Sequence, residues 1–255
     1  MLKFSRSNAK LEKLELVIDK VVYSFSLLSG WSCPFAKECL SKVRLIEGRR
    51  KLFDGIHTLF RCFSASQEAL FPKVFNSRKN NFDILKPLSE SEMIEIIVYY
   101  LPENADVIRI HVGGDFFSDK YFVAWIKVAI LFPNKIFYAY TKSLIYWIKH
   151  RELIEETRNF VLTASYGGTQ DHLIQSENLR FAKVVFSEKE AENLGLPIDH
   201  DDSHAYDPNF RHQSFALLLH GVQPKGSEAS KALKALKKLK GKGSYSKRTK
   251  INVNV

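Results

Sequence analysis

Cysteine is scarce in this chain, and its distribution is uneven. The only three cysteines are Cys33, Cys39 and Cys62, and no thiol follows. An odd number of thiols argues against a disulfide framework, which needs cysteines in pairs. Three thiols within 30 residues are instead typical of a metal site or of reactive cysteines.

A long hydrophobic run is also missing. The most apolar stretch covers residues 121–132, contains Lys127, and is shorter than the roughly 18 residues that cross a membrane. Residues 1–15 mix charges at short intervals and contain no apolar segment of a secretory signal. We therefore expect a cytoplasmic protein that has no membrane partner.

Excess basic charge is absent from most of the chain. The formal net charge is +10, but residues 225–255 contain ten Lys or Arg and one Glu. The preceding 224 residues are close to neutral, which argues against a basic nucleic-acid surface on the body. The terminal segment is the candidate contact for nucleic acid or a partner protein, through Lys237, Lys238, Lys240, Lys247 and Arg248.

The same terminal segment has an apolar stripe formed by Leu233, Leu236 and Leu239. This spacing predicts a helix that packs on the body of the protein, and such packing is compatible with a basic outer face. We expect one α/β domain over residues 1–224, with a cysteine loop at residues 30–62, followed by a basic helix and a mobile tail over residues 225–255.

Within residues 1–224, short apolar runs alternate with amphipathic segments. The predicted strands cover residues 21–28, 107–112, 135–140, 159–165, 181–187 and 214–220. The predicted helices cover residues 65–75, 89–100, 118–131, 144–156 and 188–194. Alternation of this kind predicts parallel strands joined by helices. We expect a complete or partial (β/α) barrel with its helices outside, and an open doubly wound sheet is the alternative.

Unusual polar segments follow several of the predicted strands. The cysteine loop follows the strand at residues 21–28, and Gly113-Gly114-Asp115 follows the strand at residues 107–112. Lys142 follows the next strand along the chain. Because active sites of such folds lie at the carboxyl ends of the strands, we expect these segments to meet at one edge of the sheet.

Each residue in that group has a functional interpretation and a structural one. Gly113 and Gly114 could let the backbone approach a ligand while Asp115 binds an ammonium group, or they could form a tight turn in which Asp115 caps the next helix. His111 could face the same ligand, or it could be a core histidine. Lys142 could bind a carboxylate or phosphate, or it could be a solvated charge at the start of a helix.

The three cysteines have three interpretations. Three thiolates are one short of the four that usually hold an iron–sulfur cluster, which would leave one iron open to a small ligand. Zinc is the first alternative, although structural zinc prefers four ligands in short-spaced pairs and would need a residue such as His57. Buried thiols that bind no metal are the second alternative.

A further cluster of ionisable side chains lies at residues 199–204. His200, Asp202 and His204 belong to a run of two histidines and three aspartates. Such a run could hold a divalent ion or handle protons in a hydrolase, or it could be an exposed polar loop.

Several motifs together resemble the gene-product-88 family of phage and bacterial proteins, and the resemblance covers nearly the whole chain. The first group of motifs includes Gly30-Trp31-Ser32-Cys33-Pro34 and the segment from Phe60 to Glu68. The others are Gly114-Asp115-Phe116-Phe117, Leu162-Thr163-Ala164-Ser165-Tyr166-Gly167-Gly168 and His200-Asp201-Asp202-Ser203-His204-Ala205. Membership of a phage family would make the host cytoplasm the location of the protein.

The layout is also similar to that of radical S-adenosylmethionine enzymes. The similarity implies that Cys33, Cys39 and Cys62 hold a [4Fe–4S] cluster with S-adenosylmethionine on its open iron. Residues 113–115 stand where that family has Gly-Gly-Glu, which takes the methionine ammonium. This chain has Asp115 in place of the glutamate, and it lacks the usual Cys-x3-Cys-x2-Cys spacing.

The resulting expectation is an iron–sulfur phage protein with one-electron chemistry at the open iron, and the sequence assigns no catalytic residue. The alternative is a non-enzymatic phage accessory protein whose cluster is structural and whose basic terminal segment binds nucleic acid or a host protein. A hydrolase using His200, Asp202 and His204 is the third hypothesis.

Overall fold

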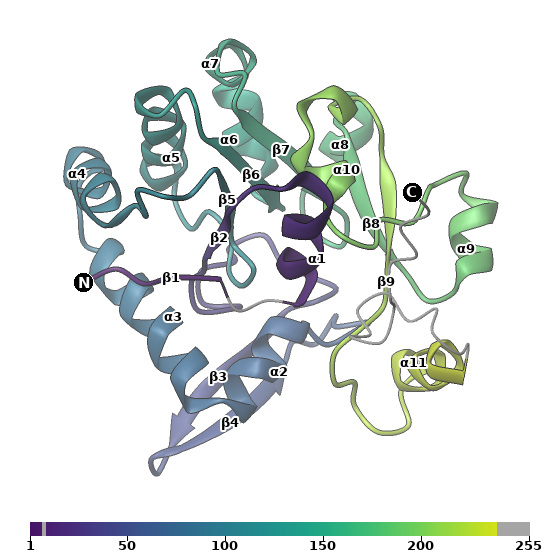
Figure 1. Ribbon diagram of the computed structural model, residues 1–255. Coiled ribbons are helices and arrows are strands. Elements are labelled where there is room, and N and C mark those ends of the chain that lie inside the picture. The colour runs from purple at the N-terminus through teal and green to yellow at the C-terminus, as the bar shows by residue number, and fades with distance from the viewer. Residues whose placement is uncertain (7–8, 239–255) are drawn as a thin grey trace.

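A seven-stranded, mostly parallel sheet forms the frame of the protein (Figure 1). The computed structural model describes residues 1–6 and 9–238. β1 pairs with β2 in antiparallel orientation, and all later pairs are parallel. In sheet order, the strands are β1 (Phe4–Ser5), β2 (Val22–Phe25), β5 (Val107–Ile110), β6 (Ile136–Thr141), β7 (Phe160–Ser165), β8 (Phe181–Val185) and β9 (Phe215–Leu218).

Helices flank this sheet, and a separate hairpin projects from it (Figure 1). The hairpin consists of β3 (Ser41–Ile46) and β4 (Arg49–Asp54). The first helices in chain order are α1 (Ala9–Ile18), α2 (Phe63–Leu70), α3 (Pro72–Leu85), α4 (Glu90–Tyr100), α5 (Asp119–Leu131) and α6 (Leu144–Lys149). The remaining ones are α7 (Arg151–Glu156), α8 (His172–Ser176), α9 (Glu188–Asn193), α10 (Ser203–Tyr206), the 3₁₀ helix η1 (Pro208–Phe210) and α11 (Glu228–Lys238).

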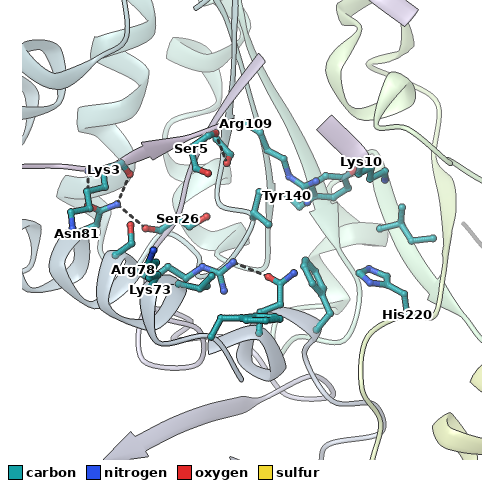
Figure 2. Close-up of a pocket in the computed structure, with 18 residues that line it drawn as sticks. Lys3, Ser5, Lys10, Ser26, Lys73, Arg78, Asn81, Arg109, Tyr140 and His220 are labelled. Atoms are coloured by element: carbon teal, nitrogen blue, oxygen red, sulfur yellow. Dashed lines mark hydrogen bonds between the residues drawn. The ribbon is translucent and has the colours of Figure 1, made fainter. Parts of the chain in front are cut away.

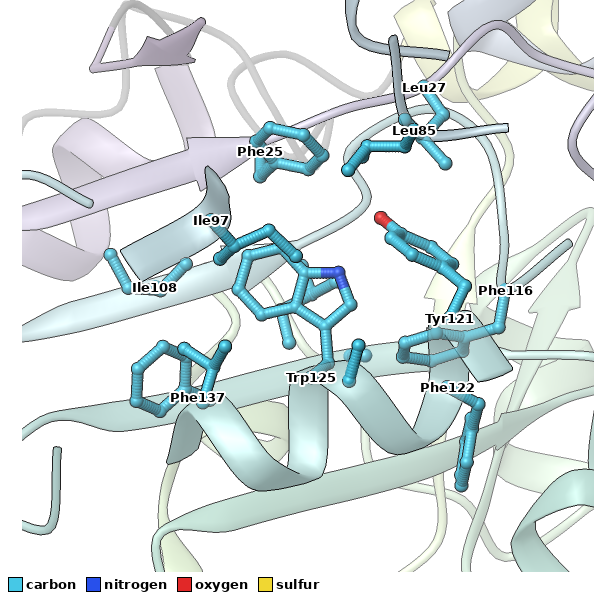
Figure 3. Close-up of a cluster of buried hydrophobic side chains, with 14 of the residues drawn as sticks. Phe25, Leu27, Leu85, Ile97, Ile108, Phe116, Tyr121, Phe122, Trp125 and Phe137 are labelled. Atoms are coloured by element: carbon cyan, nitrogen blue, oxygen red, sulfur yellow. The ribbon is translucent and has the colours of Figure 1, made fainter. Parts of the chain in front are cut away.

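Both faces of the sheet are covered by apolar side chains. On one face, Ile108 and Phe137 pack with Trp125 of α5, in the core that Figure 3 shows. Their chain neighbours Val107 and Tyr138 lie on the opposite face, which α1 and α10 cover. Successive residues of a strand point to opposite faces, so the continuous apolar runs of the sequence are the consequence of burial on both sides.

The sheet is open, and the prediction of a closed barrel is wrong. A closed barrel would need β9 to pair with β2, but the free side of β2 is occupied by β1. An open sheet with helices on both faces agrees with the alternative prediction. The six parallel strands follow one another in chain order. Their carboxyl ends therefore form one continuous edge.

Most predicted elements are present, and two differences have clear local causes. The helix predicted over residues 65–75 is interrupted at Phe71, because Pro72 begins a new helix. The helix predicted over residues 144–156 is divided at His150 into α6 and α7. Across the described ranges, no helix is both long enough and apolar enough to span a membrane.

Candidate functional site

The three cysteines line one cavity of about 170 Å³ at the carboxyl edge of the sheet. All five other residues that the sequence analysis placed near a ligand line the same cavity: His111, Gly113, Gly114, Asp115 and Lys142. The cysteines come from the segment after β2 and from the start of α2, whereas the other residues follow β5 and β6. The expected meeting of these segments is therefore present. We call this space the cysteine cavity.

The loop that contains Cys33 and Cys39 follows β2 and is attached to the segment after β7. The backbone N–H groups of Lys37 and Glu38 donate to the carbonyl oxygen of Gly167, at 3.1 and 2.9 Å. Thr169 N–H donates to the carbonyl oxygen of Phe35 at 2.9 Å. Because residues 167–169 follow β7, the loop crosses over the ends of β5 and β6 and is fixed at both sides.

Cys62 lies immediately before α2 and is positioned by contacts from the first cysteine segment. Its N–H donates to Ser41 Oγ at 3.3 Å. The buried Glu68 of α2 accepts hydrogen bonds from the N–H and hydroxyl of Ser29, and it forms a 3.0 Å ion pair with Arg78 of α3. Glu68 thus joins both cysteine-bearing segments. Glu68 is not among the site residues predicted from the sequence, although it is the only charged residue of α2.

Gly113 and Gly114 allow the same segments to approach β5. A Cβ at residue 113 would lie 2.1 Å from Ser64 Oγ, and one at residue 114 would lie 2.5 Å from Ser32 Oγ. Gly114 also has a φ of +92°, in the left-handed region that favours glycine. The structure shows protein side chains in the space that a Cβ would take, and the approach of a ligand to these glycines stays a prediction.

The thiols lie close enough to influence one another electrostatically. Burial raises the pKa of Cys33 well above its ordinary value, and negative charge on Asp115 and Cys62 would raise it further. Burial also raises the pKa of Cys62 to about 12, with a further contribution from Cys39, while the nearby N–H groups of Ala65 and Ser64 act in the opposite direction. Without a cation, these two cysteines are therefore protonated thiols at neutral pH.

Asp115 is a buried carboxylate that connects the ends of β5 and β6. Its oxygens accept hydrogen bonds from Thr141 Oγ1 at 2.7 Å, from the Lys142 N–H at 2.8 Å and from the Phe116 N–H at 2.7 Å. Burial raises its pKa to about 6, and these hydrogen bonds limit the increase. The carboxylate is therefore ionised at neutral pH and lies beside the thiols.

His111 and Lys142 both have protein partners. The His111 ring lies against Phe116, and its Nε2 is 2.9 Å from the Tyr121 hydroxyl. Burial lowers its pKa to about 3, which is the environment of the core histidine given as the alternative. The Lys142 ammonium donates to Ser165 Oγ and to the carbonyl oxygens of Ser165 and Tyr166, which uses all three of its donors.

Asp199 and Asp202 are buried, and they pair with cations from distant parts of the chain. Asp202 forms ion pairs of 2.5 Å with both Lys10 of α1 and Arg109 of β5. It also accepts hydrogen bonds from the hydroxyls of Tyr138 and Tyr140, at 2.9 and 2.8 Å. The prediction of an exposed polar loop does not hold for Asp202, which has no accessible surface.

The contacts of Asp199 bear on the expectation that residues 199–204 hold a divalent ion. Asp199 is also fully buried, and it lies 3.3 Å from the Lys10 ammonium and 3.6 Å from His204 Nδ1. In the part of the chain that the structure describes, no group of three or more His, Cys, Asp or Glu side chains converges on a single ion. In an iron–sulfur cluster the thiolates bind separate irons, so a cluster does not require such convergence.

The predicted basic helix is present as α11. It packs on the body through Ala229 and Leu236, and Lys231, Lys237 and Lys238 are exposed. The packing predicted for the apolar stripe is present at Leu233 and Leu236, and Leu239 lies outside the described residues. The other proposed nucleic-acid contacts, Lys240, Lys247 and Arg248, lie outside the described residues, as does the predicted tail.

These observations define a mixed α/β protein with a thiol-lined cavity at the carboxyl edge of an open sheet. In a comparison with protein families, the model for gene product 88 matches residues 2–238. The chain belongs to the gene product 88 family. No curated protein and no solved structure matches it, so the comparisons give no support to the similarity with radical S-adenosylmethionine enzymes.

Proposed function

We propose that the protein binds an iron–sulfur cluster through Cys33, Cys39 and Cys62, and that one iron stays open to a small ligand. The observation that supports this proposal best is that the only three thiols of the chain, separated by up to 29 positions, line one small cavity. A cluster of the [4Fe–4S] type normally takes four protein thiolates. With three, its fourth position is left for another molecule.

The surroundings of the thiols fit such a cluster. Both Cys33 and Cys62 are held in a poorly solvated environment that disfavours free thiolates, and bound metal cations would stabilise the thiolate form. The Gly30 N–H points to Cys33 Sγ at 3.3 Å, and hydrogen bonds to cluster sulfurs are a usual means of tuning reduction potential. The anchored loop and the Glu68 contacts keep the three sulfurs in place.

The cluster would supply one-electron chemistry at its open iron. S-adenosylmethionine is the small ligand that the similarity to radical S-adenosylmethionine enzymes implies, with Asp115 as the partner of its ammonium group. Asp115 is ionised at neutral pH, lines the cysteine cavity and lies beside Cys33.

Anaerobic reconstitution with iron and sulfide tests the proposal. The wild-type protein should take up iron and sulfide and become brown, and Cys33→Ala, Cys39→Ala and Cys62→Ala should each lose most of the colour. Ser91→Ala, at an exposed position in the first turn of α4 that does not line the cavity, is the matched control. A colourless protein that contains one zinc ion per chain would overturn the proposal.

The open iron requires its own measurement. Addition of S-adenosylmethionine to the reduced, reconstituted protein should change the electron spin resonance spectrum of the cluster. Asp115→Asn should weaken this effect while leaving the iron and sulfide content unchanged. An unchanged wild-type spectrum would exclude S-adenosylmethionine as the ligand while leaving cluster binding in place.

A second candidate function rests on α11. This helix packs on the body through its apolar side, and its exposed lysines form a basic outer surface. Such a surface suits the accessory role in which the protein binds nucleic acid. Replacing Lys231, Lys234, Lys237 and Lys238 by Gln should then weaken binding to DNA and reduce its salt dependence. Equal affinity and salt slope in both proteins would exclude this surface as the contact.

A further inference from the structure

A second, larger cavity of about 560 Å³ adjoins the cysteine cavity. The two cavities are neighbouring parts of one recess, because they share six lining residues. These are Phe63, Arg109, Val112, Tyr140, Leu217 and His220. The volume of the larger cavity lies within the roughly 300–1,000 Å³ that is usual for pockets that bind small organic molecules. We call this space the basic cavity.

The charged side chains that line the basic cavity are all cationic. Lys3, Lys10, Lys73, Arg78 and Arg109 contribute to its walls, and none of its described lining residues is Asp or Glu. Figure 2 shows Lys3, Lys73 and Arg78 at one end of the cavity and His220 at the other. A cavity with this composition favours a ligand that carries negative charge.

Carboxylates outside the cavity compensate three of these five cations. Lys10 and Arg109 pair with Asp202, and Arg78 pairs with Glu68. The other two cations are Lys3 and Lys73, both exposed, and no ion pair to either is present among the described residues. Two positive charges at the same end of the cavity match the charge of a phosphate monoester, which is close to −2 at neutral pH.

The end of the cavity around Lys3 is held by a buried amide. Asn81 of α3 accepts a hydrogen bond from the Lys3 N–H at 2.8 Å and donates to the carbonyl oxygens of Lys3 and Ser26, at 2.9 and 3.1 Å (Figure 2). This contact attaches the N-terminal segment to α3, which also carries Lys73. The backbone positions of the two lysines are therefore fixed relative to each other before any ligand binds.

We propose that the basic cavity binds a small phosphate monoester whose phosphate lies between Lys3 and Lys73. The apolar or aromatic body of this ligand would extend along Phe63 and Val112 towards the cysteine cavity. The role of this molecule as a substrate rests on the proposed function, because the cluster would supply the chemistry. The binding itself does not, and it is measured on iron-free protein.

Calorimetric titration with phenyl phosphate, inorganic phosphate and benzoate tests this inference. Phenyl phosphate should bind more tightly than inorganic phosphate, because its ring occupies the apolar part of the cavity. It should also bind more tightly than benzoate, which carries a single charge. Absence of phenyl phosphate binding would overturn the proposal, and benzoate binding of equal strength would overturn the choice of phosphate.

Charge-neutral variants locate the binding. The double variant Lys3→Gln/Lys73→Gln should bind phenyl phosphate about tenfold more weakly. Lys79→Gln/Lys86→Gln changes net charge equally at positions of α3 and its end that do not line the cavity, and it should bind like the wild type. Equal weakening in both double variants would mean that binding is a non-specific charge effect.

Two controls separate this inference from the proposed function. Cys62→Ala should bind phenyl phosphate like the wild type, even though it cannot assemble the cluster. Lys3→Gln/Lys73→Gln should assemble the cluster like the wild type. Loss of phenyl phosphate binding in Cys62→Ala would contradict a phosphate site at Lys3 and Lys73.

Discussion

At the scale of single residues, the charge of Asp202 is shared by two cations from different elements. Lys10 comes from α1 and Arg109 from β5, and all three side chains are largely buried. Burial alone would raise the pKa of Asp202, but the charges of Arg109 and Lys10 lower it below its ordinary value. The carboxylate is thus ionised because its partners are present, and each cation depends on it in turn.

Asp202→Asn should therefore lower the free energy of unfolding by about 3 to 5 kcal/mol, because it leaves Arg109 and Lys10 buried beside fewer negative charges. Urea denaturation followed by circular dichroism measures this loss. Asp83→Asn breaks an exposed ion pair with Lys79 and should cost less than about 1 kcal/mol. Equal losses in the two variants would contradict a role for the buried network in stability.

His220 gives a prediction for the pH dependence of stability. Burial, with the charges of Lys10 and Arg109, lowers its pKa to about 3, whereas an unfolded histidine has a pKa of about 6.5. As the pH falls below about 6.5, the unfolded chain binds a proton that the folded protein does not bind. The contribution of His220 to stability is thus complete above that pH and decreases by about 1.4 kcal/mol for each pH unit below it.

Denaturation curves between pH 6.5 and 4 test this dependence. Asp115 has the opposite effect on stability in acid, because its pKa is raised to about 6 in the folded protein. The test therefore compares the pH dependence of stability between the wild type and a His220 variant. His220→Gln should lose stability less steeply with acid than the wild type, by about 1.4 kcal/mol per pH unit. The exposed His57→Gln is the control, and parallel curves for wild type and His220→Gln would contradict the prediction.

At the scale of elements, α4 begins with a capping box that the sequence displays. Ser89 Oγ accepts a hydrogen bond from the Glu92 N–H, and the Glu92 carboxylate accepts one from the Ser89 N–H. Ser89→Ala should lower the free energy of unfolding by about 1 kcal/mol, because a backbone donor at the start of the helix loses its partner. Ser91→Ala, in the first turn of the same helix, should have a smaller effect in the same denaturation assay.

Elements with regular patterns could be predicted from the sequence, and those defined by a turn or by distant partners could not. The apolar strand β5 and the capped helices α4 and α5 lie where their patterns place them. The hairpin of β3 and β4 was missed because its strands carry many charges, although its turn at Glu47 and Gly48 has the two positive φ values of a tight hairpin.

In the candidate site, too, some contacts could be predicted from the sequence and others could not. The carboxyl-edge rule predicted that Cys33 and Asp115 meet. The contacts of Glu68 and the ion pairs of Asp202 join residues far apart in the chain, with 93 positions between Asp202 and Arg109. A single sequence contains no local pattern that specifies such pairs. The basic cavity was missed for the same reason, since Lys3 and Lys73 come from separate segments.

At the scale of the whole molecule, the main core is separate from the thiols. It is built around Trp125 and the strands, and no cysteine belongs to it. Removal of the proposed cluster should therefore leave the far-ultraviolet circular dichroism spectrum almost unchanged, unlike zinc fingers, which unfold without their metal. Hydrogen exchange should increase mainly in residues 29–62. An unfolded iron-free protein would contradict this prediction.

The attachment of the cysteine loop to Gly167 has a consequence for folding during synthesis on the ribosome. Chains grow from their N-terminus at about 5–20 residues per second, so roughly 5 to 20 s pass between the synthesis of Cys62 and that of Gly167, about 100 residues later. Throughout this interval the hydrogen bonds that fix Lys37 and Glu38 have no acceptor. We therefore expect the proposed cluster to be inserted only after Gly167 has been made, and the three thiols to stay free of metal until then.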